Sequence, residues 1–374
     1  MLMKKTLLAL TVSAFCLGGC GSSSSDDTEE KTGFTFDATE SITNLTNDII
    51  IAGYNTLRDK ADDFFLATQT LVNTPTADTL LAAQNAWKAA REPWEQGESH
   101  IFGPVDALGI DPHLDSWPLN TSDLQALLNG NSAFTTDFII SSNDDVQGFH
   151  TMEFLLFGDG VADNEKTIAE MTLREREYLS AAAEVFKSHT QKLYNAWVSG
   201  VDGEEPYQDQ LLTADNEFYT SKLAVVEELI NGMIGIVDEV GNGKISGPFG
   251  STEATADTSL VESQYSWNSL TDFTDNITGV QNIYRGEFEG SADKQGIIDF
   301  VTAADADLAT RVDDEIAASI AAIKAIAGDN NLPFRQAITD TEGRVRIQAA
   351  IDALAILQTS LENDILTLLN DWNS

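Results

Sequence analysis

Apolar side chains recur at steps of three and four residues along most of this chain, the spacing that gathers them on one face of an α-helix. Between Ile42 and Leu71 they form one uninterrupted stripe, which ends before Pro75. Similar stripes predict helices over residues 77–94, 165–197, 216–240, 263–284, 293–326 and 337–372. Alternating runs of β-branched residues, which are typical of strands, do not occur. We therefore expect an all-α fold of long helices, as in helical bundles.

The stretch at 241–259, GNGKISGPFGSTEATADTS, contains few apolar residues and several turn formers. We interpret it as the connection between an N-terminal bundle (34–240) and a C-terminal bundle (241–374). A chain of 374 residues with 42% hydrophobic residues is long enough for two domains, each with a core. About four helices are expected in each half, which suggests that the bundles are related by internal duplication.

The charge balance limits the partners of the chain. There are 21 Lys and Arg residues against 60 Asp and Glu residues, a formal net charge of −39. Such a field repels the phosphates of nucleic acids and anionic lipid surfaces, so a nucleic-acid partner is not expected. Cationic partners, metal ions among them, are favoured. The alternative is a highly solvated surface suited to a salty medium.

The first residues predict export from the cytoplasm. Lys4 and Lys5 precede an apolar stretch that is too short to span a bilayer, as in a signal peptide of residues 1–19. The stretch ends in Leu-Gly-Gly-Cys, which resembles the bacterial lipobox and makes Cys20 the lipid anchor. Residues 20–33 are almost free of apolar side chains and indicate a flexible tether. Because the residue after Cys20 is not Asp, we expect an outer-membrane lipoprotein that faces the periplasm.

The two cysteines play no part in the expected fold. Cys16 would be removed with the signal peptide, and Cys20 would carry the lipid. The remaining chain therefore offers no disulfide, no thiolate metal site and no cysteine nucleophile.

The segment GFHTMEFLLFG at 148–158 carries the most informative polar residues. If residues 147–157 are helical, His150 and Glu153 are three apart and project from the same face. An imidazole and a carboxylate at this spacing can share one metal ion, as in helical-bundle carboxylate sites. The alternative is a hydrogen-bonded pair that closes a helical turn. The apolar run from Phe154 to Phe157 would bury the pair, and a buried carboxylate needs a partner.

A second segment, upstream, supplies candidate neighbours of this pair. In WKAAREPWEQGESHIFGP at 87–104, Trp87, Arg91, Trp94 and Glu98 follow helical spacing and would share one face. Asp115 lies on a predicted loop that would close over the same place.

These two segments resemble the imelysin family of bacterial envelope proteins, whose hallmark Gly-x-His-x-x-Glu corresponds here to Gly148, His150 and Glu153. A further block, KISGP at 244–248 followed by ESQYSWNSLTDFTDNITGVQNIYRGE at 262–287, is similar to the second characteristic block of the family. The resemblance implies two helical bundles related by duplication, with the motif near a cleft between them. It carries over the following residues: Arg91, Glu98, His150, Glu153, Glu262, Ser263, Ser266, Ser269, Asp272, Asn276 and Tyr284.

The family was first described as peptidases, and some relatives are associated with iron uptake. We therefore expect an envelope protein that binds a metal ion, iron or zinc, or an iron-containing ligand through His150 and Glu153, and that assists metal uptake. An envelope uptake partner is expected with it. Arg91, Glu98, Asp115, Ser266 and Asp272 are the expected neighbours.

Three alternatives remain open at this point. One is a metallopeptidase in which Glu153 acts as general base, although the chain has no His-Glu-x-x-His and a catalytic zinc normally takes three protein ligands. His100 or His113 would have to supply a further imidazole. Another is a non-catalytic interaction protein. Haem binding through His150 is the least favoured, since the expected pocket is polar.

Overall fold

The computed structural model describes residues 33–373. The predicted signal peptide, Cys20 and the tether up to residue 32 lie outside the described residues. Within them the fold is all-α, as predicted: no strand occurs there, and one isolated β-bridge joins Phe34 to Trp372. None of the described helices is long and apolar enough to cross a membrane.

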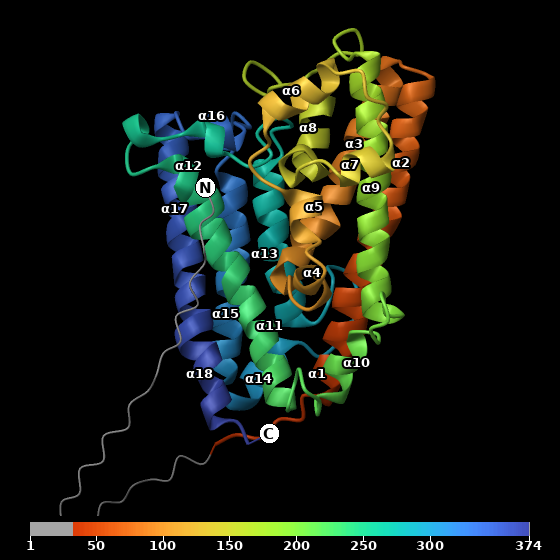
Figure 1. Cartoon of the computed structure of the whole chain (residues 1–374). Helices are drawn as coiled ribbons and strands as arrows, with labels where there is room; N and C mark the ends of the chain where they lie inside the picture. Colours follow the sequence, from red (N-terminus) through yellow and green to blue (C-terminus); the bar gives the residue numbers. More distant parts are fainter. Residues whose placement is uncertain (1–32, 374) are drawn as a thin grey trace, which may run out of the picture. The chain divides into compact units, whose positions relative to one another are not determined.

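Three long helices form the first half of the structure (Figure 1). The first is continuous through α1 (Thr39–Asn44), the π-helical η1 (Leu45–Ile51) and α2 (Ala52–Asn73). It packs against α3 (Ala77–Gly97) and α9 (Leu173–Val198). Thr76 caps α3 by accepting a hydrogen bond from the Thr79 N–H, which fixes its start after the break at Pro75. The predicted helices at 42–71 and 77–94 are thus confirmed with small extensions.

Short elements fill the space between α3 and α9. They are η2 (Glu98–His100), α4 (Pro104–Ala107), α5 (Asp111–Asp115), α6 (Thr121–Asn129), α7 (Thr136–Ile140), η3 (Asp144–Val146) and α8 (Gly148–Phe157). The helix predicted for 147–157 is therefore present as α8, and every residue in it except Phe154 is buried. It begins at Gly148, whose φ is +68° and where a Cβ atom would lie 2.3 Å from the Leu114 carbonyl oxygen. Only glycine permits this close approach of α8 to α5.

The second half contains a further group of long helices. Its elements are α10 (Gln208–Thr213), α11 (Lys222–Asp238), η4 (Glu239–Ile245), α12 (Ser246–Phe249), η5 (Glu253–Thr255), η6 (Thr258–Leu260), α13 (Ser269–Arg285), α14 (Ile297–Ala304), α15 (Ala306–Ala325), α16 (Phe334–Ala337), α17 (Thr341–Thr359), η7 (Ser360–Ile365), α18 (Leu366–Leu368) and η8 (Leu369–Asp371). Helices α11, α13, α15 and α17 pack against one another. Figure 1 shows that the long helices of both halves run roughly along one direction.

Several predicted boundaries were wrong. Residues 241–259, interpreted as a connection, are helical up to Phe249, because α11 continues through η4 into α12. The helix predicted for 293–326 is interrupted at Asp305, whose side chain accepts hydrogen bonds from the backbone N–H groups of residues 307 and 308 and starts α15. The helix predicted for 165–197 begins only at Leu173, after a capping box formed by Thr172 and Glu175.

The two halves pack closely on each other through α3 and α13. Gly279 of α13 faces the backbone of α3, where a Cβ atom would lie 2.1 Å from the Gln96 carbonyl oxygen. The chain from Gly33 onward forms one compact unit. The division into bundles at 34–240 and 241–374, and their duplication, stay predictions, and residue 240 itself lies inside η4.

Candidate metal site

One face of α3 carries large and charged side chains into the interior. Trp87, Arg91 and Trp94 follow helical spacing, and all three are buried. The Trp87 indole N–H donates to the Phe149 carbonyl of α8 at 3.0 Å, and the Trp94 indole N–H donates to Asp115 Oδ2 at 2.7 Å. The two indoles therefore fix α3 against α8 and against the end of α5, with Arg91 between them.

Arg91 is fully buried and is surrounded by carboxylates. Its guanidinium contacts Glu95 and Asp115, lies 2.5 Å from Glu262 Oε1, and places Nε 3.3 Å from Asp272 Oδ2. Burial alone would lower the pKa of Arg91, but these carboxylates raise it well above its usual value. Arg91 is therefore a permanent cation that holds together α3, α5, α13 and the segment before α13.

Lys244 of η4 is a second buried cation, and the sequence analysis missed it. Its ammonium lies 2.7 Å from Glu98 Oε2, 3.3 Å from Glu262 Oε2 and 3.5 Å from Glu95 Oε2. Asn276 of α13 donates to Glu95 at 2.6 Å and to Glu98 at 2.8 Å. Burial raises the pKa of Glu98 to about 8, against the opposing effect of Lys244. Through Lys244 and Asn276, Glu95 and Glu98 thus join the C-terminal end of α3 to η4 and α13.

His150 presents its two ring nitrogens to different carboxylates. Nδ1 lies 3.1 Å from Glu153 Oε2, whereas the buried Nε2 lies 3.1 Å from Asp115 Oδ1 and 3.8 Å from Glu262 Oε1. The edge of Trp117 packs on the ring, with centroids 4.6 Å apart. Burial alone would lower the pKa of His150, but the carboxylates of Asp115 and Glu153 raise it to about 9.

Glu153 is bound through both of its carboxylate oxygens. Oε2 contacts the His150 ring, and Oε1 accepts three hydrogen bonds: from the Tyr265 N–H at 3.0 Å, the Ser266 N–H at 2.7 Å and the Ser266 hydroxyl at 2.7 Å. The backbone of the segment before α13 therefore orients Glu153, and Glu153 in turn orients the imidazole.

Donor atoms from three distant segments converge beside Nε2. Ligand atoms of Asp115, His150 and Glu262 all lie within 4.8 Å of one another, close enough to hold one metal ion. Imidazole and carboxylate donors suit iron and also zinc. An overlapping group with the same spacing consists of Glu95, Glu98 and Asp115.

A cavity of about 460 Å³ borders these donors. The carboxylates that line it are Glu98, Asp111, Asp115, Glu239 and Glu262. Lys244 is the one basic residue among the described residues of its wall. Burial, followed by the nearby charge of Asp115, raises the pKa of Asp111 to about 6. The lining is acidic, so it attracts cations rather than anions.

The structure brings the predicted site residues together. Arg91, Glu98, Asp115, Ser266 and Asp272 all lie in the cluster around His150 and Glu153. Glu262 and Asn276, expected from the resemblance, belong to it as well. Ser269 supports it by donating to the Glu262 carbonyl at 2.6 Å. Tyr284 does not reach it: its hydroxyl donates to the Ala309 carbonyl at 2.9 Å.

The other histidines lie apart from the described donor group. The His113 ring stacks on His189 with centroids 4.8 Å apart, and its Nδ1 lies 2.8 Å from Asp144 Oδ1. His100 contacts the Tyr54 hydroxyl through Nδ1 at 3.1 Å. Neither residue supplies the further imidazole that the peptidase hypothesis requires.

The fold and the site define a class: all-α proteins with a buried histidine and carboxylate cluster between long helices. The chain belongs to the imelysin family, whose model matches residues 50–361. It is 28% identical over 332 residues to iron-regulated protein A of Synechococcus elongatus, covering 88% of this chain and 86% of that one.

Solved structures agree with this assignment. The structure named as an iron-regulated protein A precursor of Parabacteroides distasonis has a TM-score of 0.78 and 27% identity, over 93% of this chain and 97% of that chain. An imelysin-like protein of Psychrobacter arcticum has the same fold, with a TM-score of 0.69, 15% identity and coverage of 90% and 98%.

Proposed function

We propose that this protein is an envelope lipoprotein that binds a metal ion, iron foremost, through Asp115, His150 and Glu262, and that assists iron or metal uptake. Its relative in Synechococcus elongatus is named an iron-regulated protein, which supports iron over other metals. The metal is cargo in this proposal and not a resident catalytic group.

The observation that carries the proposal is the arrangement of His150. Its Nε2 is buried and faces Asp115 Oδ1 at 3.1 Å and Glu262 Oε1 at 3.8 Å, while Glu153 orients the ring from Nδ1. In the absence of metal a proton on Nε2 pairs with Asp115, and a metal ion would replace that proton between the imidazole and the two carboxylates. Metal-bound histidines commonly have a carboxylate on the second ring nitrogen, which is the role that Glu153 fits here.

The charge of the site also fits a cation. Arg91, Lys244 and the protonated His150 are cations of the described cluster, and each contacts more than one of its carboxylates. Burial raises the pKa of Glu95 and Asp272, so these two carboxyl groups already resist ionisation. A bound metal ion would bring positive charge beside these carboxyl groups and favour their ionised form.

The proposed location rests on residues 1–33. Lipidation at Cys20 would anchor the chain at the outer membrane and leave the folded part in the periplasm. Metabolic labelling of the full chain with a radioactive fatty acid tests this, with Cys20→Ala as the control. Absence of label in the unsubstituted chain would refute the anchor.

The metal site is tested by elemental analysis. Residues 33–374 form a compact unit, so this part is purified without chelator or affinity metal and exposed to Fe, Zn, Mn and Ca. We expect about one iron or zinc per chain, and loss of that metal in His150→Ala and in Asp115→Asn. An unsubstituted protein that stays empty after exposure to all four metals would refute the proposal.

Glu153→Gln separates a ligand from a positioning residue. The amide oxygen can still accept the hydrogen bonds from the Tyr265 and Ser266 N–H groups, while the negative charge beside His150 is lost. If Glu153 acts through His150, the variant keeps a metal site with roughly 10- to 100-fold weaker affinity. Complete loss of binding, equal to that of His150→Ala, would instead make Glu153 a direct ligand.

The peptidase hypothesis is less well supported. Both oxygens of Glu153 are bound to His150, Tyr265 and Ser266, so neither is free to activate a water molecule. The same metal-loaded preparation can be assayed for hydrolysis of casein. Metal-dependent cleavage that is lost in Glu153→Gln, with metal retained, would favour an enzyme over a binding protein.

A further inference from the structure

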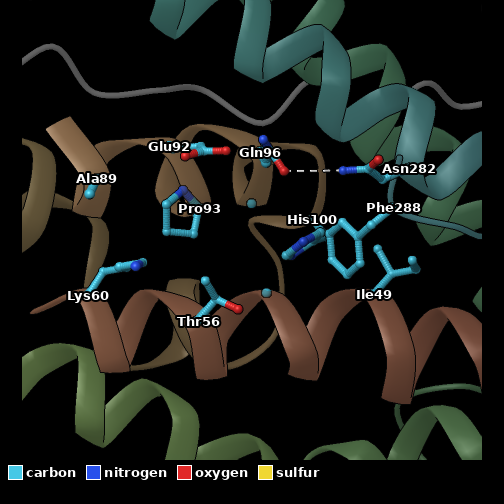
Figure 2. A pocket seen from close by; sticks show the side chains of 12 residues that line it. Ile49, Thr56, Lys60, Ala89, Glu92, Pro93, Gln96, His100, Asn282 and Phe288 are labelled. Atoms are coloured by element: carbon cyan, nitrogen blue, oxygen red, sulfur yellow. Dashed lines mark hydrogen bonds between the residues drawn. The ribbon is translucent and has the colours of Figure 1, made fainter. Parts of the chain in front are cut away.

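A second pocket lies between α2 and α3, on a different face of α3 from the buried charge cluster (Figure 2). Its volume is about 320 Å³, near the lower end for small-molecule sites. Small residues create this space. Gly53 of α2 has no atom within 4 Å of the position where a Cβ would stand, and Ala89 and Gly97 line the α3 side.

One end of the pocket is largely apolar. Ile49 and Phe288 lie there beside the imidazole of His100, whereas Pro93 lies nearer Glu92 (Figure 2). His100 is only 3% exposed, and its Nδ1 contacts Tyr54, whereas Nε2 makes no hydrogen bond to a described residue. A buried ring with one nitrogen left for a ligand gives this end a polar atom within an apolar surface.

Two opposite charges stand on the facing walls of the pocket. Lys60 extends from α2 and Glu92 from α3 (Figure 2). They are the charged residues of the lining, apart from the imidazole, and neither forms an ion pair with a described residue. Several other lysines of the described chain are paired, such as Lys187 with Asp62 at 2.9 Å and Lys222 with Asp37 at 2.8 Å. Lys60 instead faces the pocket (Figure 2).

Pro93 also interrupts the backbone hydrogen bonding of α3 beside the pocket. Pro93 stands inside α3 and has no N–H group to donate to the carbonyl of Ala89, which lines the pocket. The α3 wall presents the Glu92 carboxylate, which is suited to an ammonium group. The α2 wall presents an ammonium group, suited to a carboxylate.

We propose that this pocket binds a small zwitterion with an apolar side chain, that is, a free apolar amino acid. Its carboxylate pairs with Lys60, its ammonium group with Glu92, and its side chain packs against Ile49, Pro93 and Phe288. A simple carboxylic acid would face Glu92 without compensation, and a simple amine would face Lys60. The site is separate from the proposed metal site and does not depend on it.

Isothermal titration of the chain from residue 33 with L-leucine tests the proposal. For a ligand of this size we expect a Kd on the order of 100 µM. Leucinamide, which lacks the carboxylate, and 4-methylpentanoate, which lacks the ammonium group, should each bind about tenfold more weakly or worse. Equal binding of either analogue, or no saturable heat with L-leucine, L-valine or L-phenylalanine at millimolar concentration, would overturn the assignment.

Two variants with matched controls locate the binding. Lys60→Met should weaken L-leucine binding about tenfold, and Lys187→Met should leave it unchanged. Gly53→Leu should fill the pocket and abolish binding. Gly235→Leu, at another helical glycine with open space around it, should have no effect. Retained binding in Gly53→Leu would place the ligand elsewhere, and circular dichroism verifies that each variant is folded.

Discussion

Replacing Arg91 tests whether the buried charge cluster depends on one cation. In Arg91→Met the side chain keeps an unbranched stem but lacks the guanidinium, so it loses the contacts with Glu95, Asp115, Glu262 and Asp272. Breaking a buried ion pair by removing one partner typically costs about 3–5 kcal/mol. Because burial already raises the pKa of Glu95 and Asp272, the carboxyl groups can take up protons, and the cost does not multiply by four. We expect a loss of about 3–5 kcal/mol in the free energy of unfolding.

The assay is urea unfolding at neutral pH, followed by circular dichroism at 222 nm, on the chain from residue 33. Arg311→Met is the matched control, because Arg311 also contacts two acidic residues, Glu315 at 3.1 Å and Asp364 at 2.5 Å, but is 48% exposed. Exposed pairs of this kind are worth about 1 kcal/mol or less. If the two variants differ by less than ~1 kcal/mol, Arg91 does not stabilise the cluster, and the reasoning fails.

Two further predictions concern the contact between α3 and α13. Gly279→Ala places a methyl group 2.1 Å from the Gln96 carbonyl oxygen, so it should lower the free energy of unfolding in urea by about 3 kcal/mol. Gly235→Ala, in open space, should raise it by about 0.5–1 kcal/mol. Equal effects of the two variants would disprove the close approach. Burial raises the pKa of the Asp275 carboxyl group to about 7, although a hydrogen bond from Gln96 acts against this rise. The folded state therefore holds the carboxyl proton more tightly than the unfolded chain does, and stability is lost as the pH rises through 7. Asp275→Asn should therefore gain about 4 kcal/mol relative to the unsubstituted protein between pH 4 and pH 8.5, since each unit of pKa shift corresponds to about 1.4 kcal/mol. A pH-independent difference would contradict this.

Helical periodicity predicted the fold class and most of the long helices, because the apolar stripes reflect burial directly. The boundaries were harder to predict, since they depend on single capping side chains. Thr172 and Glu175 start α9 later than the apolar stripe suggests, and Asp305 divides one predicted helix into two. A capping side chain changes helix stability by only about 1 kcal/mol. An effect of this size cannot be predicted from the composition of a segment.

The candidate site was predictable only where its residues are neighbours in the sequence. The spacing of His150 and Glu153 indicated a pair on one helical face, and α8 confirms that geometry. The spacing did not indicate that Glu153 contacts the backbone before α13, because no local pattern relates residues more than 100 positions apart. Lys244 was missed for another reason: the glycines around it have low helix propensity, yet the segment is helical.

The geometry of the site depends on the number of residues in the π-helical segment η4. An α-helix turns about 100° per residue, and a π-helical stretch takes up one more residue in its turn than α geometry allows. Residues Glu239–Ile245 therefore adjust the rotational phase between α11 and the polypeptide that leads to Glu262. Deleting a single residue here would let the segment close as a regular α-helix, and the position of Lys244, which lies within it, relative to Glu98 and Glu262 would change. The number of residues in this segment is thus as much a determinant of the site as their identity.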